Sequence, residues 1–111
     1  MSKDINDLKK AERYLQPCIK YSGEPLYKQV KKLEEEVAEV KQALSDFKFY
    51  QDNYHKQTLA VEIVDVIITG ISFLYMLGYL SLKQRLPLYQ IAFLKNYKRG
   101  YYNRDGFGGL K

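Results

Sequence analysis

The sequence predicts an all-α protein organised around two long helices. Apolar residues recur at alternating steps of four and three from residue 26 to residue 47, which is the spacing of one helix face. A second and far more apolar stretch extends from residue 58 to residue 80. Because 111 residues suffice for one small domain, we expect a single domain over residues 1–111, a helical bundle with its core in residues 26–99.

The composition and the first residues of the chain indicate the cellular compartment. The chain is 46% hydrophobic and 28% charged, and its single cysteine, Cys18, excludes an internal disulfide and is typical of a reducing compartment. The first residues, MSKDINDLKK, contain no apolar signal segment. We therefore expect a cytoplasmic protein.

The net charge of +5 is unevenly distributed along the chain. Residues 33–82 contain eight acidic and three basic side chains, whereas residues 83–111 contain seven basic and one acidic. A basic segment can bind nucleic acid, and it can equally serve a metal-bound polyphosphate. We do not expect a nucleic-acid partner, because no helix-turn-helix or other recognised motif accompanies the charge.

The N-terminal part is predicted to be a short, mostly polar helix followed by a connection. Residues 16–25, QPCIKYSGEP, contain two prolines, a glycine and a serine, which predicts a turn-rich segment. The preceding helix is expected over residues 4–15, and its apolar side holds Ile5, Leu8 and either Tyr14 or Leu15.

The first long helix is predicted to follow Pro25, a residue that suits the first helical turn. It should end at a loop near residues 49–56, where the chain becomes polar. The apolar seam continues over three heptads without interruption. Its members are Leu26, Val30, Leu33, Val37, Val40, Leu44 and Phe47.

The second long helix, predicted over residues 58–80, is apolar on most sides. Its polar members fall within a wedge of roughly 80°. Such a helix is buried in a bundle, in an oligomer core or in a membrane. The 17 residues from Val66 to Leu82 carry no charge, which is near the lower limit for a membrane span. We favour a bundle helix in an oligomer and no membrane, because a polar stripe heads the run: Glu62, Asp65, Thr69 and Ser72.

The C-terminal part is predicted to contain a shorter helix. Leu86 and Pro87 mark a break, and residues 88–97 follow with a helical pattern. Gly100 suits the end of that helix. Residues 100–111 are expected to form a loose basic tail.

The acidic residues of the two long helices form one constellation. Glu35, Glu36 and Glu39 span a wedge of about 100° on the first helix. An antiparallel hairpin would place the pair Glu36 and Glu39 near the pair Glu62 and Asp65 of the second helix, at levels that differ by a few ångströms. Four converging carboxylates are unfavourable without a counter-charge, and divalent cations supply one.

All-oxygen ligands select hard cations, Mg²⁺ first and Mn²⁺ next. A carboxylate-bound Mg²⁺ typically keeps positions for water and substrate phosphates, which suits phosphoryl chemistry. Two simpler interpretations stay open. The run from Glu34 to Glu36 can be a solvated face near a helix start, and the second pair can form ion pairs with Lys32 or Lys41.

The acidic pattern resembles a known signature. Glu35-Glu36-x-x-Glu39, separated by 22 residues from Glu62-x-x-Asp65, is similar to the EExxE…ExxD motif of the MazG-like all-α nucleoside triphosphate pyrophosphohydrolases. The context is similar too, with a lysine three residues before the double glutamate and the run VDVIITGISFLYMLG after Asp65. The resemblance covers about residues 26–99.

The resemblance implies a four- to five-helix, oligomeric fold, either a homodimer or a homotetramer. It implies Mg²⁺-dependent hydrolysis of an NTP or dNTP to the monophosphate and pyrophosphate, in nucleotide-pool housecleaning, and it is compatible with a phage-type member. By position, the metal ligands would be Glu36, Glu39, Glu62 and Asp65. Glu35 would orient or deprotonate the attacking water, and Lys32 would stand by the phosphates.

A basic element near the end of the last predicted helix resembles the family's KN-x-x-R element, whose side chains reach the nucleotide. It consists of Lys95, Asn96 and Arg99. A basic helix end exposed to solvent explains the same residues without a nucleotide. The alternative to an enzyme is a non-catalytic helical protein of the same fold that binds a nucleotide or a partner.

Overall fold

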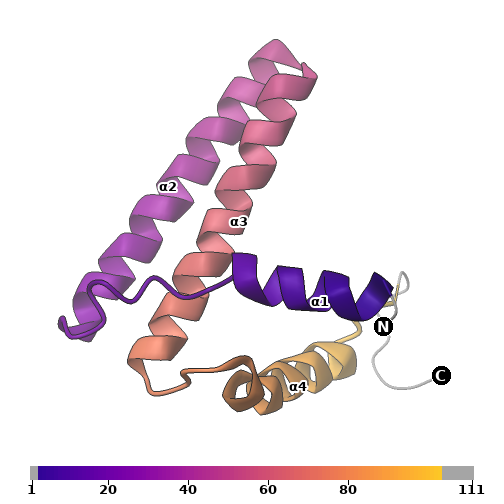
Figure 1. The fold of residues 1–111 in the computed structure, drawn as a ribbon. Coiled ribbons are helices and arrows are strands. Elements are labelled where there is room, and N and C mark those ends of the chain that lie inside the picture. Colours follow the sequence, from indigo (N-terminus) through magenta and orange to yellow (C-terminus); the bar gives the residue numbers. More distant parts are fainter. Residues whose placement is uncertain (1–2, 104–111) are drawn as a thin grey trace. The chain divides into compact units, whose positions relative to one another are not determined.

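The computed structural model describes residues 3–103, and within them the chain is α-helical with no strand (Figure 1). Four α-helices follow one another, which confirms the predicted all-α class. The chain divides into two compact units, Met1–Gly78 and Tyr79–Lys111. Most of the expected basic tail, residues 104–111, lies outside the described residues.

The first unit is built on a helical hairpin. Helix α1 covers Lys3–Tyr14, α2 covers Leu26–Tyr50 and α3 covers Asn53–Met76. Figure 1 shows α2 and α3 antiparallel and side by side, as the sequence predicts. This hairpin fixes which acidic residues of the two helices can meet.

The connection between α2 and α3 is much shorter than the loop predicted at residues 49–56. Helix α2 ends at Tyr50, and Gln51, its C-cap, has a left-handed backbone (φ 52°) and donates its N–H to the Phe47 carbonyl oxygen at 2.8 Å. Asp52 then caps α3, because its side chain accepts a hydrogen bond of 2.7 Å from the His55 N–H. The polar residues that predict a loop are thus a cap and the first turn of a helix.

The second unit contains α4, Leu82–Lys98, and here the predicted break at Pro87 is wrong. The helix begins before the proline because Ser81 and Gln84 form a capping box. Pro87 lies inside the helix, where it has no N–H to donate to the Lys83 carbonyl oxygen. Gly100 (φ 77°) ends the helix as predicted, with its N–H bonded to the Tyr97 carbonyl oxygen.

The polar stripe of α3 faces α2 and the α1–α2 connection. Thr69 and Ser72 are more than nine-tenths buried. The Ser72 hydroxyl accepts a hydrogen bond of 2.9 Å from the Cys18 backbone N–H, and Gln29 donates one of 3.2 Å to the Thr69 carbonyl oxygen. The polar side of α3 is therefore the packed side.

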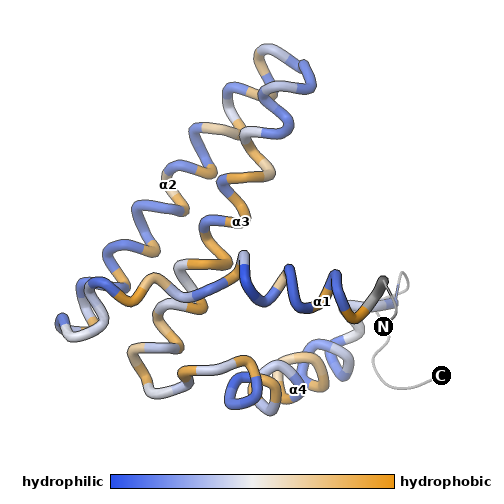
Figure 2. Tube along the Cα trace, in the orientation of Figure 1, coloured by the Kyte–Doolittle hydropathy of each residue, from blue (hydrophilic) through white to orange (hydrophobic). Residues whose placement is uncertain are grey.

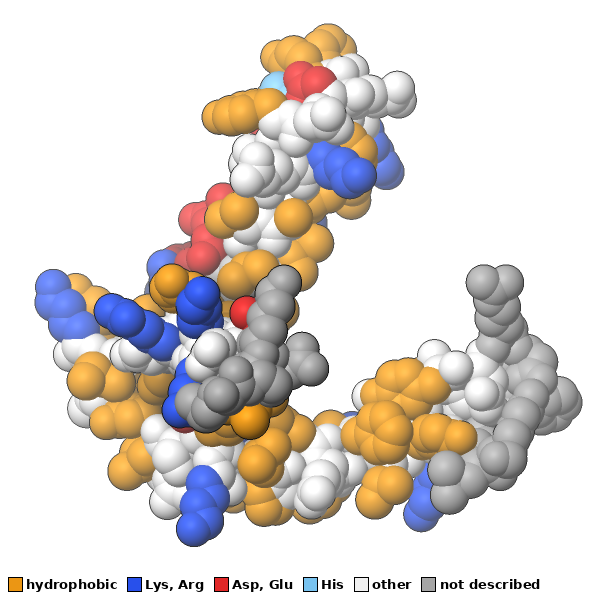
Figure 3. Space-filling model, turned by 45° about the vertical axis from the view of Figure 1, so that its right-hand side comes forward, with side chains coloured by type: hydrophobic (Ala, Val, Ile, Leu, Met, Phe, Trp, Pro, Cys, Tyr) orange, Lys and Arg blue, Asp and Glu red, His pale blue; other side chains and the backbone are white. Residues whose placement is uncertain are grey.

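The apolar side of α3 is largely uncovered in a single chain. Among the described residues, the buried hydrophobic side chains are those of Ala43 and Ile71. Figure 2 shows that α3 is much more hydrophobic than the mostly hydrophilic α1. Figure 3 shows hydrophobic side chains along the surface of the hairpin. By length and composition alone α3 also meets the criteria for a membrane span, with a mean hydropathy of 1.9 over 18 residues.

Candidate metal centre

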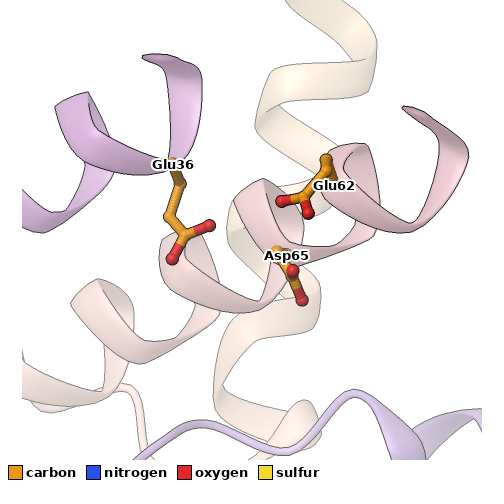
Figure 4. Close-up of side chains that lie close together, drawn as sticks. All are labelled: Glu36, Glu62 and Asp65. Carbon is orange, nitrogen blue, oxygen red and sulfur yellow. The ribbon is translucent and has the colours of Figure 1, made fainter. Parts of the chain in front are cut away.

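Three of the predicted ligands come together between α2 and α3. Glu36 extends from α2 toward α3, which carries Glu62 and Asp65 (Figure 4). One carboxylate oxygen from each residue lies within 4.8 Å of the other two. The hairpin geometry and the i, i+3 spacing on α3 suffice to bring them together.

Two carboxylate oxygens at this place are buried without a donor. Glu36 is 7% exposed, and neither its Oε2 atom nor Oε2 of Glu62 has a hydrogen-bond partner among the described residues. A buried polar atom without a partner is costly, and a second negative charge beside it adds repulsion. The pair therefore calls for a proton or a cation.

Lys32 supplies part of the missing charge. Its Nζ atom lies 3.0 Å from Oε1 of Glu36, one helical turn away. The Glu36 carboxylate, through this hydrogen bond and its charge, raises the pKa of Lys32. The lysine side chain is about half exposed, so this contact satisfies one oxygen of Glu36 and leaves the Lys32 ammonium open to solvent.

Glu39 lies near the cluster but outside the close group of three. It is exposed, and it lines a cavity together with Glu62. The charge of Glu36, followed by the nearby Glu62 carboxylate, raises the pKa of Glu39 above its usual value. Glu39 therefore lies close to both carboxylates, although it is outside the group of three whose oxygens lie within 4.8 Å of one another.

The remaining predicted site residues are Glu35 in the first unit and three residues in the second unit. Glu35 is exposed on α2, and the structure gives it no ion pair or hydrogen bond with another described residue. Lys95, Asn96 and Arg99 lie at the end of α4, in the second unit, where Asn96 is half-buried and the two basic residues are exposed. Their predicted role at the nucleotide stays a prediction.

The cluster fits a hard divalent cation in ligand type and nearly in size. Every candidate ligand atom is a carboxylate oxygen, which Mg²⁺ and Mn²⁺ prefer. Opposite ligands of Mg²⁺ are about 4.2 Å apart, twice its usual bond length. Since the present atoms lie within 4.8 Å of one another, small rotations of these side chains would close the set around the ion.

The structure adds a feature that the sequence interpretation missed. A cavity of about 210 Å³ lies beside the cluster, toward the turn of the hairpin. His55, interpreted from sequence as a loop residue, lines it with Gln42 and Asp46. The sequence contains a pattern that predicts this shared lining: Gln42 and Asp46 follow Glu39 at steps of three and seven, the spacing of one helix face.

Known proteins do not supply a family for this chain. Comparisons with models of protein families, with curated proteins and with solved structures find no match. A functional assignment therefore depends on the chemistry of the carboxylate cluster and on the motif resemblance.

Proposed function

We propose that the protein is a Mg²⁺-dependent nucleoside triphosphate pyrophosphohydrolase of the MazG-like kind. The observation that carries the proposal is the pair of buried, donor-free oxygens of Glu36 and Glu62, which face each other from two helices with Asp65 alongside. Such a set is unfavourable alone and favourable around a divalent cation. The EExxE…ExxD pattern of the same residues supports the choice of reaction.

The roles of the cluster residues follow from their positions, and the role of Glu35 follows from the motif resemblance. Glu36, Glu62 and Asp65 would hold the cation, which when bound would supply positive charge for the substrate phosphates and for the activation of a water. Glu39 is close enough to be drawn in as a further ligand. Glu35 would take the proton of the attacking water after turning in from its exposed position.

Lys32 is placed to contact first the Glu36 carboxylate and then a substrate phosphate. Its ammonium group contacts Glu36 at 3.0 Å and is still about half exposed. When a cation takes over the neutralisation of Glu36, the flexible lysine side chain can turn to a substrate phosphate. The lysine thereby remains paired with an anion in both states.

Assembly is part of the proposal. An isolated chain exposes several apolar side chains of α3, among them Val61, Ile63, Val64 and Ile67, whereas a homodimer or homotetramer would cover them. We propose a cytoplasmic homo-oligomer acting on the nucleotide pool.

The test is a panel of the common NTPs and dNTPs with Mg²⁺ or Mn²⁺, analysed for products. We expect a nucleoside monophosphate and pyrophosphate, and no reaction in the presence of EDTA. Asp65→Asn should lower kcat by at least about a hundredfold, because it removes one charged ligand of the cluster. Glu34→Gln, a change of an exposed glutamate outside the cluster, is the matched control and should keep full activity.

A non-catalytic nucleotide-binding protein of the same fold is the second candidate. The exposed position of Glu35, away from the cluster, favours it, because the expected proton acceptor is not in place. This candidate predicts Mg²⁺-dependent nucleotide binding by calorimetry without any product. Turnover that disappears in Asp65→Asn would rule it out.

A further inference from the structure

The cavity beside the carboxylate cluster shares Glu62 with it and adds polar groups that the cluster does not contain. It is open to solvent and lies on the side of the cluster that faces the hairpin turn, with Ala43 of α2 in its wall. Its volume, about 210 Å³, is smaller than the roughly 300–1,000 Å³ of pockets that hold whole drug-sized ligands, and it suits a smaller group such as a sugar. Its polar lining consists of Glu39, Gln42, Asp46, His55, Thr58 and Glu62.

The polar groups of α2 in this cavity present mostly acceptors. Gln42 donates from Nε2 to Oδ1 of Asp46 at 3.1 Å, and this bond holds both side chains in place. The second oxygen of Asp46 has no hydrogen bond to another described residue. The amide oxygen of Gln42 is a further acceptor.

The groups of α3 add to the same character. Thr58 donates its hydroxyl proton to the Tyr54 carbonyl oxygen at 3.0 Å, so its oxygen remains as an acceptor. Nδ1 of His55 lies 2.7 Å from Oδ1 of Asp52, and a neutral ring that donates from Nδ1 presents Nε2 as an acceptor. The His55 ring is also stacked on Tyr50, with 4.3 Å between ring centroids, which fixes its direction.

The polar groups of this cavity are acceptors and carboxylates, and they favour one kind of ligand chemistry. Phosphates and carboxylates are repelled, whereas groups that donate several hydrogen bonds, such as the hydroxyls of a sugar, are favoured. The cavity shares Glu62 with the cluster, and Glu39 lies beside both. In a nucleotide, the group next to the phosphates is the sugar.

We propose that this cavity binds the ribose of a nucleoside triphosphate, and that Asp46 and Thr58 accept hydrogen bonds from its hydroxyl groups. The inference rests on the proposed function, because the cluster must hold the phosphates for the sugar to reach the cavity. It adds a substrate class to that function: ribonucleotides in preference to 2′-deoxyribonucleotides. Asp46 is the specificity-determining residue and has no part in the chemical step.

The experiment compares matched NTP and dNTP pairs with Mg²⁺ in the full-length protein. A hydrogen bond to a charged group contributes about 1.5–3 kcal/mol, so kcat/KM should favour the ribonucleotide by roughly tenfold to a hundredfold. Asp46→Asn keeps the side-chain shape and should bring the ratio close to one, and Thr58→Val should lower it. Glu34→Gln should leave the ratio unchanged. In parallel, binding of AMP and dAMP with Mg²⁺ is followed by the NMR signals of Gln42 and Thr58.

The outcomes separate this inference from the proposed function. Turnover with equal efficiency for both sugars, or a ratio that Asp46→Asn and Thr58→Val leave unchanged, overturns the ribose site while the hydrolase stands. Absence of turnover with AMP-selective shifts at Gln42 and Thr58 supports the ribose site and overturns the hydrolase. Absence of both overturns the two together.

Discussion

Glu36 is the side chain on which the candidate centre depends most. It is 7% exposed, its Oε1 atom is paired with Lys32, and its Oε2 atom has no partner among the described residues. Its carboxylate therefore bears the cost of burial and the repulsion of Glu62 and Asp65 at once. A bound cation would remove both.

We expect Mg²⁺ to stabilise the wild-type protein and Glu36→Gln to lose that response. At a concentration one hundred times the dissociation constant, a ligand that binds the folded state alone adds about 2.7 kcal/mol of stability. Without Mg²⁺, Glu36→Gln should be at least as stable as wild type, since one of three mutually repelling charges is gone. Thermal unfolding with and without MgCl2 measures both effects.

Glu34→Gln is the control, because Glu34 is an exposed glutamate on the same helix but outside the cluster. It should keep the full response to Mg²⁺. An equal response in Glu36→Gln would show that the cation binds elsewhere.

The site could be predicted from sequence to the extent that helical spacing determines it. Glu62 and Asp65 were predictable because two acids in an apolar helix need a polar environment, and Glu36 because the hairpin opposes it to them. Glu35 and Glu39 share the wedge on the helical wheel, yet the structure leaves both exposed. The wheel gives the direction of a side chain but not the depth of the groove it enters, which depends on how closely the helices pack.

At the scale of the element, Asp52 is responsible for the abrupt start of α3. Its carboxylate accepts hydrogen bonds of 2.7 Å from both the backbone N–H and Nδ1 of His55. These bonds, the backbone one first, hold the pKa of Asp52 below its usual value of 3.8. The folded state therefore binds this proton less readily than the unfolded state does.

The sign of the pH effect follows from this depressed pKa. The stabilisation from Asp52 is fully present above pH 3.8 and is lost as the pH falls through the lower pKa of the folded state. Asp52→Asn provides the matched variant, because asparagine caps helices about as well and does not titrate. In urea unfolding, the wild-type protein should lose more stability than Asp52→Asn as the pH falls from 6 to 3. A difference that is constant with pH would contradict the assignment.

The helices themselves were predictable, whereas their ends were less so. Periodicity defines the interior of α2 and α3, but polar residues near residue 52 suit a loop, a cap or a first turn equally well. Which of the three forms depends on the left-handed backbone of Gln51, a conformation that the residue type does not predict. The predicted break at Pro87 was wrong for a related reason: the capping box at Ser81 and Gln84 starts α4 before the proline, and the helix continues through it.

At the scale of the whole molecule, the exposed side of α3 poses the largest physical problem. Ile63 is 46% exposed, Val64 41% and Ile67 48%, and these side chains lie on the side of the helix away from its polar stripe. Contiguous apolar surface of this kind is rarely left in water. A second copy of the chain or a membrane would cover it.

The polar stripe favours the second copy. A helix that crosses a lipid bilayer alone would carry Glu62 and Asp65 into it, whereas the hairpin keeps both acids against α2 and leaves the apolar side for a partner. We therefore expect a homo-oligomer that is soluble without detergent and that contacts its partner through Ile67. Burial of an isoleucine contributes about 1.5–3 kcal/mol, so Ile67→Glu should weaken self-association by at least about tenfold.

Sedimentation over a range of protein concentrations measures this effect, and Leu8→Glu on α1 is the control, since Leu8 is 70% exposed and outside the hairpin. Leu8→Glu should leave the oligomer intact. A protein that sediments only with lipid, or an Ile67→Glu variant that associates as tightly as wild type, would contradict the interface on α3. The carboxylate cluster faces the opposite side of this helix. Ile67→Glu should therefore retain the thermal response to Mg²⁺ in proportion to its folded fraction. A retained response distinguishes loss of assembly from loss of the metal centre.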